Sequence, residues 1–307
     1  MQSLVGGVSG ALILRFEARD RSWVLRVEPE RIALEDRQRG FTCMLAAAAA
    51  GAAPKVIHAD AASGLAIMDF IVTRPVLEHP GGPIGLARAL GALSTRVRAT
   101  DPFPKVGDYP VLIGNMLTRL GKSSLLAPGL LDPHAEGLAR IRAALPWNEA
   151  SLVSSHNDPN PRNILFDGER LWLIDWELAG LNDPLVDIAI LTNDLANTPE
   201  MEDELLHAAF PRQGRFLRAR LGVVRVLTRL FYGCIVLETF AAVSLDAPIP
   251  TLAGVSPAAF RRLVADGKLA SGAPETAYAF AMMSLAEFIR GVTAPVFAQT
   301  LEMASQA

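Results

Sequence analysis

Short runs of strand-forming residues dominate the first seventy positions of the chain. Residues 11–17 and 22–27 are rich in such side chains and are joined by a polar turn, which predicts a β-hairpin. Residues 31–53 are helical by composition and end before a proline, which predicts one helix. Two further strands are expected at residues 55–58 and 65–71. This part of the chain therefore predicts a small β-rich unit built around one helix.

The apolar positions beyond this point recur mostly at helical spacing. Helices are expected at residues 84–100, 134–145 and 184–195, with long helices between 213 and 244 and between 274 and 303. One interruption, residues 151–177, is typical of short strands and loops. A β-rich segment followed by a helical one predicts an α+β fold of two lobes, residues 1–72 and 73–307, with a hinge near residues 69–73.

Composition narrows the class of protein and of partner. The chain has 307 residues, of which 50% are hydrophobic and 20% charged, with a net charge of −3. Acidic and basic residues are spread along it, which gives no reason to expect nucleic acid or an anionic membrane as the partner. The N-terminus does not resemble a signal peptide, and no apolar run reaches the ~18 residues of a bilayer span. Cys43 and Cys234 are expected to be buried thiols in a reducing cytosol, so we expect a soluble, cytoplasmic protein.

The most informative stretch lies inside the interruption and holds the residue types that phosphoryl transfer needs. That reaction needs a carboxylate to orient the attacking hydroxyl, oxygen ligands for Mg²⁺, and a cation that offsets phosphate charge. Asp158 and Asn163, which follow His156, have the D-x-x-x-x-N spacing of a kinase catalytic loop. This spacing lets one tight loop aim a carboxylate at the substrate and a carboxamide at the metal. Asp158 by itself is also compatible with a helix cap.

A second acidic residue follows after a short hairpin. Residues 164–166 and 171–174 predict two strands joined at an Asp-Gly pair, which is a strong turn signal. The hairpin returns the chain and can place Asp175 beside Asn163, and Mg²⁺ favours such oxygen ligands together with substrate phosphates. Asp175 by itself is also compatible with a surface carboxylate at a strand end. The joint occurrence of loop, hairpin, upstream strands and downstream helices favours a kinase-like enzyme over coincidence.

This stretch resembles the choline/ethanolamine kinase and aminoglycoside phosphotransferase superfamily, which implies a protein-kinase-like fold. The order His156-Asn157-Asp158 is more similar to the choline/ethanolamine branch, because the aminoglycoside branch usually has glycine in the middle. Residues 174–177 and 182–189 also look like bacterial members of that branch, which overlaps with thiamine kinases. The resemblance covers most of the chain, but the last hundred or so residues match only loosely.

The resemblance implies roles for five residues of this stretch. Asp158 would be the catalytic base, and Asn163 and Asp175 would be the magnesium ligands. His156 and Asp187 would hold the catalytic loop in place.

A glycine-rich segment before the first strand is the first candidate for the ATP site. Backbone amides of such a turn can approach phosphates closely, although glycines also mark a flexible terminus. The resemblance implies that this segment is the phosphate-covering hairpin, with Gly6, Gly7, Ser9 and Gly10 as contacts. It further implies that Met68 faces the adenine and that the backbone of Asp69 to Ile71 hydrogen-bonds it.

Arg26 occupies the position of the β-strand lysine of protein kinases. Arginine is common there in the choline-kinase-like branch, and its fixed charge suits phosphate, whereas an exposed strand arginine is the alternative. The family normally carries a glutamate on the following helix that pairs with this cation. In this chain that position falls at or near Gly40, and Glu35 and Asp36 lie more than one turn earlier. Either one of them substitutes, or Arg26 is held otherwise, or the activity is weakened.

Aromatic and acidic residues near the site lead us to expect a cationic acceptor. A quaternary ammonium group would favour an aromatic cage with acid nearby. The candidate walls are Trp176, Tyr232, Tyr278 and Phe280, although aromatic residues at helical spacing are more often core. Glu177 and Asp183 either attract a cation or hold loops. Trp147 and Trp172 are expected to be packing residues, and the lack of tryptophan beyond Trp176 weakens the case for choline itself.

The sequence therefore predicts an ATP- and Mg²⁺-dependent phosphotransferase that acts on the hydroxyl of a small molecule, expected to be a cationic amino alcohol such as choline or ethanolamine. Aminoglycoside-type and thiamine-type kinases are alternatives within the same resemblance. An aminoglycoside enzyme would favour an unusually acidic acceptor cleft, which the sequence does not show. A non-catalytic, nucleotide-binding pseudokinase is a further alternative, motivated by Gly40. The oligomeric state and the identity of the acceptor do not follow from the sequence.

Overall fold

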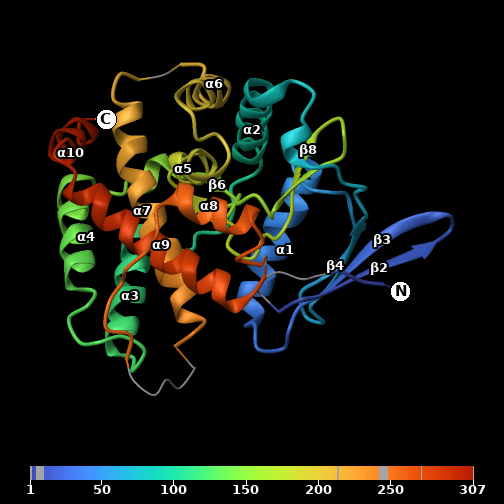
Figure 1. Ribbon diagram of the computed structural model, residues 1–307. Helices are drawn as coiled ribbons and strands as arrows, with labels where there is room; N and C mark the ends of the chain where they lie inside the picture. The colour runs from blue at the N-terminus through green and yellow to red at the C-terminus, as the bar shows by residue number, and fades with distance from the viewer. Residues whose placement is uncertain (1, 5–9, 213, 242–247, 271, 307) are drawn as a thin grey trace. The chain divides into compact units, whose positions relative to one another are not determined.

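The computed structural model describes residues 2–4, 10–212, 214–241, 248–270 and 272–306. The chain divides into two compact units, whose elements are labelled in Figure 1. The first unit combines Met1–Val106 with Asn148–Gln213, and the second combines Gly107–Trp147 with Gly214–Ala307. The lobe boundary expected at residue 72 is a different division of the chain and stays a prediction.

A five-stranded antiparallel sheet of order β1-β2-β3-β5-β4 forms the N-terminal part of the first unit. Its strands are β1 (Gln2–Leu4), β2 (Leu12–Ala18), β3 (Arg21–Val27), β4 (Val56–Asp60) and β5 (Leu65–Asp69). The β2–β3 hairpin turns at Arg19 and Asp20, whose φ angles of 51° and 59° match the tight turn that suits the strand twist. The hairpin and the two later strands expected from the sequence are thus confirmed.

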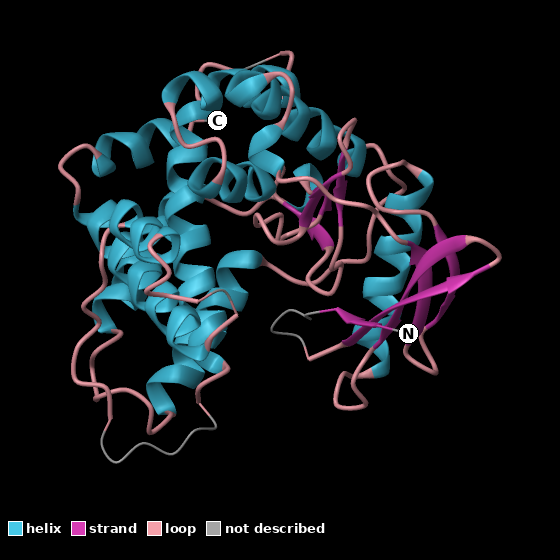
Figure 2. Cartoon of the chain, turned by 45° about the vertical axis from the view of Figure 1, so that its right-hand side comes forward, coloured by secondary structure: helices cyan, strands magenta, loops and turns pink. Residues whose placement is uncertain are grey.

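One helix, α1 (Leu34–Ala49), lies beside this sheet (Figure 2). Its buried residues recur at helical spacing and include Phe41, Cys43, Met44 and Ala47. The helix ends where Gly51 adopts a φ of 69°, a conformation that glycine reaches without steric cost. The expected helix is confirmed with a later start and an earlier end.

Short strands and helices complete the first unit. The strands are β6 (Val153–Ser155), β7 (Ile164–Phe166), β8 (Leu171–Leu173) and β9 (Gly180–Asn182), paired β6 with β9 and β7 with β8. The helical elements are η1 (Val76–Glu78), α2 (Gly82–Arg98), η2 (Glu149–Ser151), α5 (Leu185–Asp194) and α6 (Pro199–Ala209). The chain leaving β5 runs along β7, because the Arg74 N–H donates to Phe166 O at 2.7 Å. The large sheet and the segment with the catalytic motif therefore belong to one body.

The second unit is entirely helical in its described elements. These are α3 (Tyr109–Lys122), α4 (Asp132–Ala144), α7 (Leu217–Glu238), α8 (Pro257–Ala265), α9 (Pro274–Thr293) and α10 (Phe297–Ala304). Helices α7 and α9 pack closely, since a Cβ at Gly233 would lie 2.6 Å from Leu285 Cγ. A sheet-bearing N-terminal region and a helical C-terminal region confirm the α+β class. No single helix among the described residues is long and apolar enough to cross a membrane, although α9 and α10, which meet at an 83° bend, pass that test as a pair.

Three helices, α3, α6 and α8, were not expected from the apolar pattern. Each begins with a side chain that accepts a hydrogen bond from a backbone N–H of the first turn, namely Asp108, Thr198 and Ser256. Each also carries a proline at its first or second position. These are established helix-start signals, so the helices were foreseeable from their caps and not from their periodicity.

A buried histidine lies in the core of the second unit. His134 on α4 is 3% exposed, stacks on Phe288 with ring centroids 5.7 Å apart, and donates from Nε2 to Leu285 O at 3.3 Å. Its Nδ1 is buried without a hydrogen-bond partner among the described residues. Burial favours the neutral ring and lowers the pKa of His134 to about 4, although the bond to Leu285 opposes this shift.

We expect the protein to lose stability between pH 7 and pH 5 because of His134. In the unfolded chain His134 binds a proton near pH 6.5, whereas in the folded chain it does so only near pH 4. The free energy of unfolding therefore decreases as the pH is lowered below 6.5, by about 2 kcal/mol at pH 5. Urea unfolding at both pH values measures the effect. His134→Gln should reduce the difference, whereas the control His207→Gln, at an exposed histidine, should keep it. An unchanged pH difference in His134→Gln would contradict the assignment.

Candidate functional site

The catalytic loop is fixed by one buried carboxylate. Asp187, which is 5% exposed and lies in the first turn of α5, accepts hydrogen bonds from Ser155 Oγ, His156 N and Asn157 N at 2.8 to 2.9 Å. Three donors around one carboxylate hold the chain as it leaves β6. Asp187 therefore determines the path of the loop that carries Asp158.

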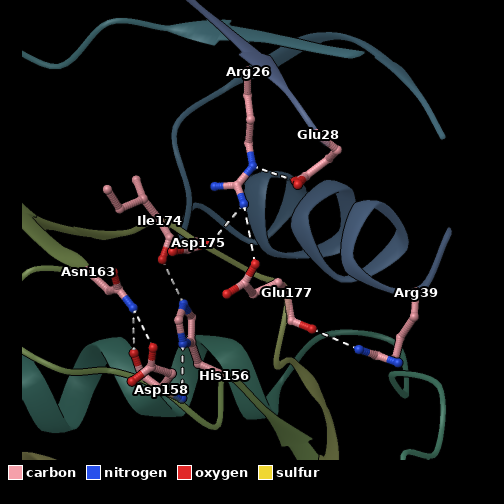
Figure 3. Close-up of polar contacts among 9 residues, drawn as sticks. All are labelled: Arg26, Glu28, Arg39, His156, Asp158, Asn163, Ile174, Asp175 and Glu177. Carbon is pink, nitrogen blue, oxygen red and sulfur yellow. Dashed lines mark hydrogen bonds and ion pairs between the residues drawn. The ribbon is translucent and has the colours of Figure 1, made fainter. Parts of the chain in front are cut away.

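His156 and Asn157 brace the same loop from inside. His156 donates from Nε2 to Ile174 O at 2.9 Å and accepts at Nδ1 from the Asp158 N–H at 3.3 Å, as Figure 3 shows. Asn157 adopts a φ of 63°, a conformation that asparagine tolerates better than most residues. Its amide donates to Leu178 O at 2.9 Å, and its Oδ1 accepts from Asn182 at 2.8 Å. Both side chains are buried, so they shape the loop from within the protein.

We expect Asp187→Asn to destabilise the protein by about 2–3 kcal/mol, because one acceptor oxygen becomes a donor that faces another N–H. Urea unfolding measures the loss. Asp101→Asn, at an exposed aspartate of the same unit, is the control and should change the free energy of unfolding by less than about 0.5 kcal/mol. Equal stability of the two variants would show that Asp187 does not hold the loop.

The structure brings Asp158 and Asn163 together. The Asn163 Nδ2 donates to both Asp158 Oδ2 and Asp158 O at 2.9 Å, and the Asn160 Nδ2 donates to Asp158 Oδ1 at 2.8 Å. The carboxylate is thereby held in one orientation while it remains half-buried. Such an oriented carboxylate can accept a proton from a hydroxyl placed against it.

The hairpin of β7 and β8 places Asp175 close to Asn163. Ile164 pairs with Leu173, and the Ile174 N–H then donates to Asn163 O at 3.0 Å. Asp175 follows directly with a φ of 68°, which turns the chain away from the strand. The two expected metal ligands thus leave adjacent positions of one hairpin.

The donor set fits Mg²⁺. Asn163 uses Nδ2 for Asp158, which leaves its carboxamide oxygen for a cation, and Asp175 offers a carboxylate that Arg26 contacts at Oδ1. Mg²⁺ commonly takes one or two protein carboxylates and completes its shell with water and phosphate oxygens. Within the described ranges, no group of three or more His, Cys, Asp or Glu side chains could hold a metal ion. A magnesium ion here would therefore depend on a nucleotide for its remaining ligands.

Arg26 faces this pair from the large sheet. Its Nε lies 2.6 Å from Glu28 Oε1, and its Nη2 lies 2.9 Å from Asp175 Oδ1 and 3.8 Å from Glu177 Oε2 (Figure 3). Burial by itself would lower the pKa of Arg26, but the nearby Asp175 and Glu28 carboxylates outweigh it and raise the pKa. The alternative of an exposed strand arginine is wrong, because the Arg26 side chain is only 12% exposed.

Glu177 is the third carboxylate at this site. Burial raises the pKa of Glu177 to about 7, repulsion from Asp175 adds to the rise, and Arg26 opposes it. Three carboxylates, those of Glu28, Asp175 and Glu177, therefore surround one guanidinium. This imbalance favours the binding of a further cation beside Asp175.

Helix α1 reaches the same segment through the side chain of Arg39 and not through a glutamate. The Arg39 Nη2 donates to Glu177 O at 2.8 Å, and Asp36 pairs with Arg39. A Cβ at Gly40 would lie 3.4 Å from Trp176 O, so the helix passes close to the chain after Asp175. Of the three possibilities that the sequence left open, the geometry supports the second, in which Arg26 is held by a residue outside the helix, here Glu28. Glu28 and Arg39 were both missed in the sequence.

The expected adenine-binding residues lie on β5 and just beyond it. Val24 pairs with Met68 and Arg26 with Ala66, so Met68 and Arg26 share one face of the sheet. The Asp69 N–H is already bonded to Lys55 O at 2.9 Å. In the described part of the chain the Ile71 N–H has no hydrogen-bond partner, which leaves it for a ligand.

The glycine-rich segment is described only in part. Gly10 is exposed and has a φ of 75°, whereas Gly6, Gly7 and Ser9 lie outside the described residues. The assignment of this segment to phosphate therefore stays a prediction.

The expected acceptor residues have mixed surroundings. Trp176 is 4% exposed and packs against His156, with ring centroids 4.5 Å apart, which makes it a core residue. Asp183 is also buried and accepts from the Leu185 N–H at 2.9 Å, so it holds a loop at the start of α5. Glu177, by contrast, keeps 37% of its side chain exposed.

The aromatic residues of the second unit are packed among one another. Tyr232 is 8% exposed and contacts Phe280 with ring centroids 5.8 Å apart, and Tyr278 contacts Phe240 at 6.1 Å. Tyr278 and Phe280 are half-buried. Trp147 stacks on Tyr109 in this unit, and Trp172 donates to Asp167 at 2.7 Å in the first unit. The cage role of Tyr232, Tyr278 and Phe280 stays a prediction.

A curated relative matches a short part of the chain. The protein LicA of Haemophilus influenzae is 33% identical over 86 residues, which are 28% of this chain and 32% of that protein. The chain thus aligns with about a third of the length of this relative.

Solved structures match nearly the whole chain. A choline/ethanolamine kinase family protein from Mesorhizobium loti has a TM-score of 0.70 and 22% identity, covering 99% of this chain and 92% of that one. Choline kinase LicA from Streptococcus pneumoniae has a TM-score of 0.63 and 15% identity, covering 94% and 95%. LicA in complex with AMP has a TM-score of 0.62 and 14% identity, covering 94% and 91%. At these identities the likeness shows the fold, and the expected kinase-like fold is confirmed.

A family model covers the segment that holds every residue of the loop, the hairpin and the large sheet. The model of the phosphotransferase enzyme family APH matches residues 2–222, well over half of the 307 residues. The resemblance expected from the sequence is thereby confirmed, and the chain belongs to the APH phosphotransferase enzyme family.

Proposed function

We propose that this phosphotransferase transfers the γ-phosphate of ATP to the hydroxyl of a small molecule. The observation that carries the proposal is the convergence of Asp158, Asn163 and Asp175 beside Arg26, whose side chain is only 12% exposed. These are the parts that phosphoryl transfer needs, a hydroxyl-orienting carboxylate, metal ligands and a fixed cation.

Asp158 is the residue that receives the acceptor hydroxyl. Its two oxygens are oriented by Asn160 and Asn163, and a carboxylate oxygen can accept more than one hydrogen bond. A hydroxyl bound there would transfer its proton to Asp158 as its oxygen forms the new bond to the γ-phosphorus, while the bond from that phosphorus to the bridging oxygen breaks and ADP leaves with the electron pair. General-base catalysis of this kind contributes roughly 10²–10⁴-fold to the rate.

Asn163 and Asp175 would hold Mg²⁺, which offsets the charge of the phosphates when it is bound. Arg26 adds a second, permanent positive charge on the same side of the sheet as Met68. Met68 would contact the adenine, and the backbone of Asp69 and Ile71 would meet its polar edge. The AMP complex of LicA supports a nucleotide in this fold.

The acceptor is proposed to be a cationic amino alcohol such as choline or ethanolamine. The excess of carboxylates at Glu28, Asp175 and Glu177 supports a cationic ligand, as do the kinases of choline and ethanolamine among the similar structures. Part of that charge will be neutralised by Mg²⁺, which makes the half-exposed Glu177 the residue best placed to attract the acceptor.

A panel of hydroxyl compounds tests the acceptor class. ADP release from MgATP is measured with choline, ethanolamine, thiamine, an aminoglycoside, glycerol and glycerate, each at the same concentration. We expect turnover with at least one cationic compound to exceed that with the neutral and anionic ones by tenfold or more. Turnover confined to glycerol or glycerate would contradict the cationic acceptor and leave the phosphotransferase reading in place. Turnover of thiamine or the aminoglycoside alone would select the alternative kinase types.

A non-catalytic pseudokinase is the remaining candidate, motivated by the missing helix glutamate. Arg26 is nevertheless paired, since Glu28 contacts its Nε. The missing helix glutamate therefore does not distinguish a pseudokinase from an active enzyme. Magnesium-dependent ATP turnover decides between these two functions.

A further inference from the structure

The carboxylate that contacts Arg26 most closely comes from the residue directly after its own strand. Glu28 Oε1 lies 2.6 Å from Arg26 Nε, and the two side chains are 8% and 12% exposed. This contact leaves the other side of the guanidinium, at Nη2, facing Asp175 at 2.9 Å. Glu28 and Asp175 therefore share one cation from two directions (Figure 3).

The local backbone explains why Glu28 can reach this position. Residues two apart in an extended chain point to the same side, so Glu28 follows Arg26 on the face that meets Asp175. The Glu28 N–H donates to Gly64 O at 2.8 Å, which anchors the residue just beyond the end of β3. A Cβ at Gly64 would lie 3.3 Å from Glu28 Cβ, so glycine leaves room for this side chain.

Helix α1 contributes no carboxylate to Arg26 among the described residues. Its Gly40 lies next to Trp176 O, and its acidic residue Asp36 is paired with Arg39 instead. The helix holds the segment after Asp175 through the Arg39 side chain, which donates to the main-chain oxygen of Glu177. Two tasks are thus divided, since α1 positions the metal-binding segment and Glu28 positions the cation.

We propose that Glu28 is the positioning residue of Arg26 for the binding of MgATP. Tied at Nε, the guanidinium meets Asp175 through Nη2, at Oδ1, which leaves the other oxygen of that carboxylate for Mg²⁺. Without the Glu28 charge, Arg26 pairs more tightly with Asp175 and competes with the metal. This role rests on the proposed function, because it presumes that Arg26 and Asp175 act on a magnesium nucleotide.

Glu28→Gln tests this role with little change of shape. Titration calorimetry with ATP at a series of magnesium concentrations should show about tenfold weaker MgATP binding, and half-saturation at a higher magnesium concentration. Glu17→Gln makes the same change on the neighbouring strand β2, at a side chain that is 75% exposed and paired with Arg15. This control should bind MgATP as the parent does, because surface pairs contribute little.

A second comparison separates positioning from a general structural role. The same substitution, Glu28→Gln, is also made in a protein that already carries Arg26→Gln, and binding of MgATP is measured as the rise in Tm at millimolar nucleotide. There Glu28→Gln should not weaken MgATP binding further, since Glu28 acts through Arg26. Glu28→Asp keeps the charge and should lose less affinity than Glu28→Gln, and it takes over the test if Glu28→Gln does not fold. Parent-like binding by Glu28→Gln, or an equal loss in both backgrounds, would overturn the proposal. A parent protein that binds no MgATP would instead overturn the proposed function, and this role with it.

Discussion

Asp158→Asn is expected to lower kcat by at least about 10²-fold while the Kd for MgATP stays within about twofold of the parent value. The substitution removes the base that accepts the hydroxyl proton, and general-base contributions are of this size. It keeps the shape of a side chain that is held by amide groups of Asn160 and Asn163. Steady-state kinetics with the best acceptor of the panel, combined with calorimetry for ATP, measure the two effects separately.

Asp101→Asn serves as the matched control, because it makes the same change at an exposed site of the same unit. It should keep the parent kcat. Near-normal turnover by Asp158→Asn would contradict the assignment of the base. A loss of ATP affinity as large as the loss of kcat would show that the substitution damages the loop as a whole.

Asp175→Asn is expected to remove the magnesium dependence of ATP binding. Even the outer partners of metal ligands change metal affinity by about 10–100-fold, so the loss of a direct carboxylate ligand should cost at least about a hundredfold. Asparagine is preferable to alanine here, because Asp175 has a φ of 68°, which asparagine tolerates. Calorimetry with ATP, with and without magnesium, is the measurement.

The control for Asp175→Asn is Glu169→Gln, which removes one charge from the exposed turn of the same hairpin. It should leave the strengthening of ATP binding by magnesium unchanged. An Asp175→Asn variant in which magnesium still strengthens ATP binding as in the parent would refute the metal-ligand role.

The parts of the site that the sequence predicted are those governed by local geometry. Asp158 and Asn163 are five residues apart in one loop, and the Asp-Gly turn of the β7–β8 hairpin determines that Asp175 returns beside Asn163. The spacing of these residues is sufficient to foresee their proximity. The same holds for the β2–β3 hairpin, whose polar turn separates two strand-forming runs.

Contacts between distant segments were not predictable from these patterns. Arg39 donates to the main-chain oxygen of Glu177, 138 positions away, and a backbone acceptor leaves no mark in the sequence. Trp176 was a candidate cage wall because it adjoins Asp175, yet its ring is buried against His156 and Phe103. In an irregular segment, the direction of a side chain cannot be inferred from the direction of its neighbour in the sequence.

Glu28 is an intermediate case. It follows Arg26 by two residues, directly after the strand predicted at residues 22–27, and in extended chain this spacing places both side chains on one side. The partner of the cation was expected on the following helix, near Gly40, whereas Glu28 supplies the carboxylate in the structure. When the carboxylate expected to pair with a strand cation is missing, a carboxylate two residues along the chain can take its place.

Phosphorus NMR of a reaction mixture shows directly whether the γ-phosphate of ATP reaches an acceptor. The parent protein is incubated with MgATP and the cationic compounds of the panel, in parallel with Asp158→Asn. With the parent protein, we expect the γ-phosphate signal of ATP to decline while ADP and a phosphate monoester of one acceptor appear in equal amounts. With Asp158→Asn, we expect neither change. A spectrum in which ATP persists with every acceptor, although calorimetry shows that the protein binds MgATP, would contradict the account and identify a nucleotide-binding protein without phosphotransferase activity.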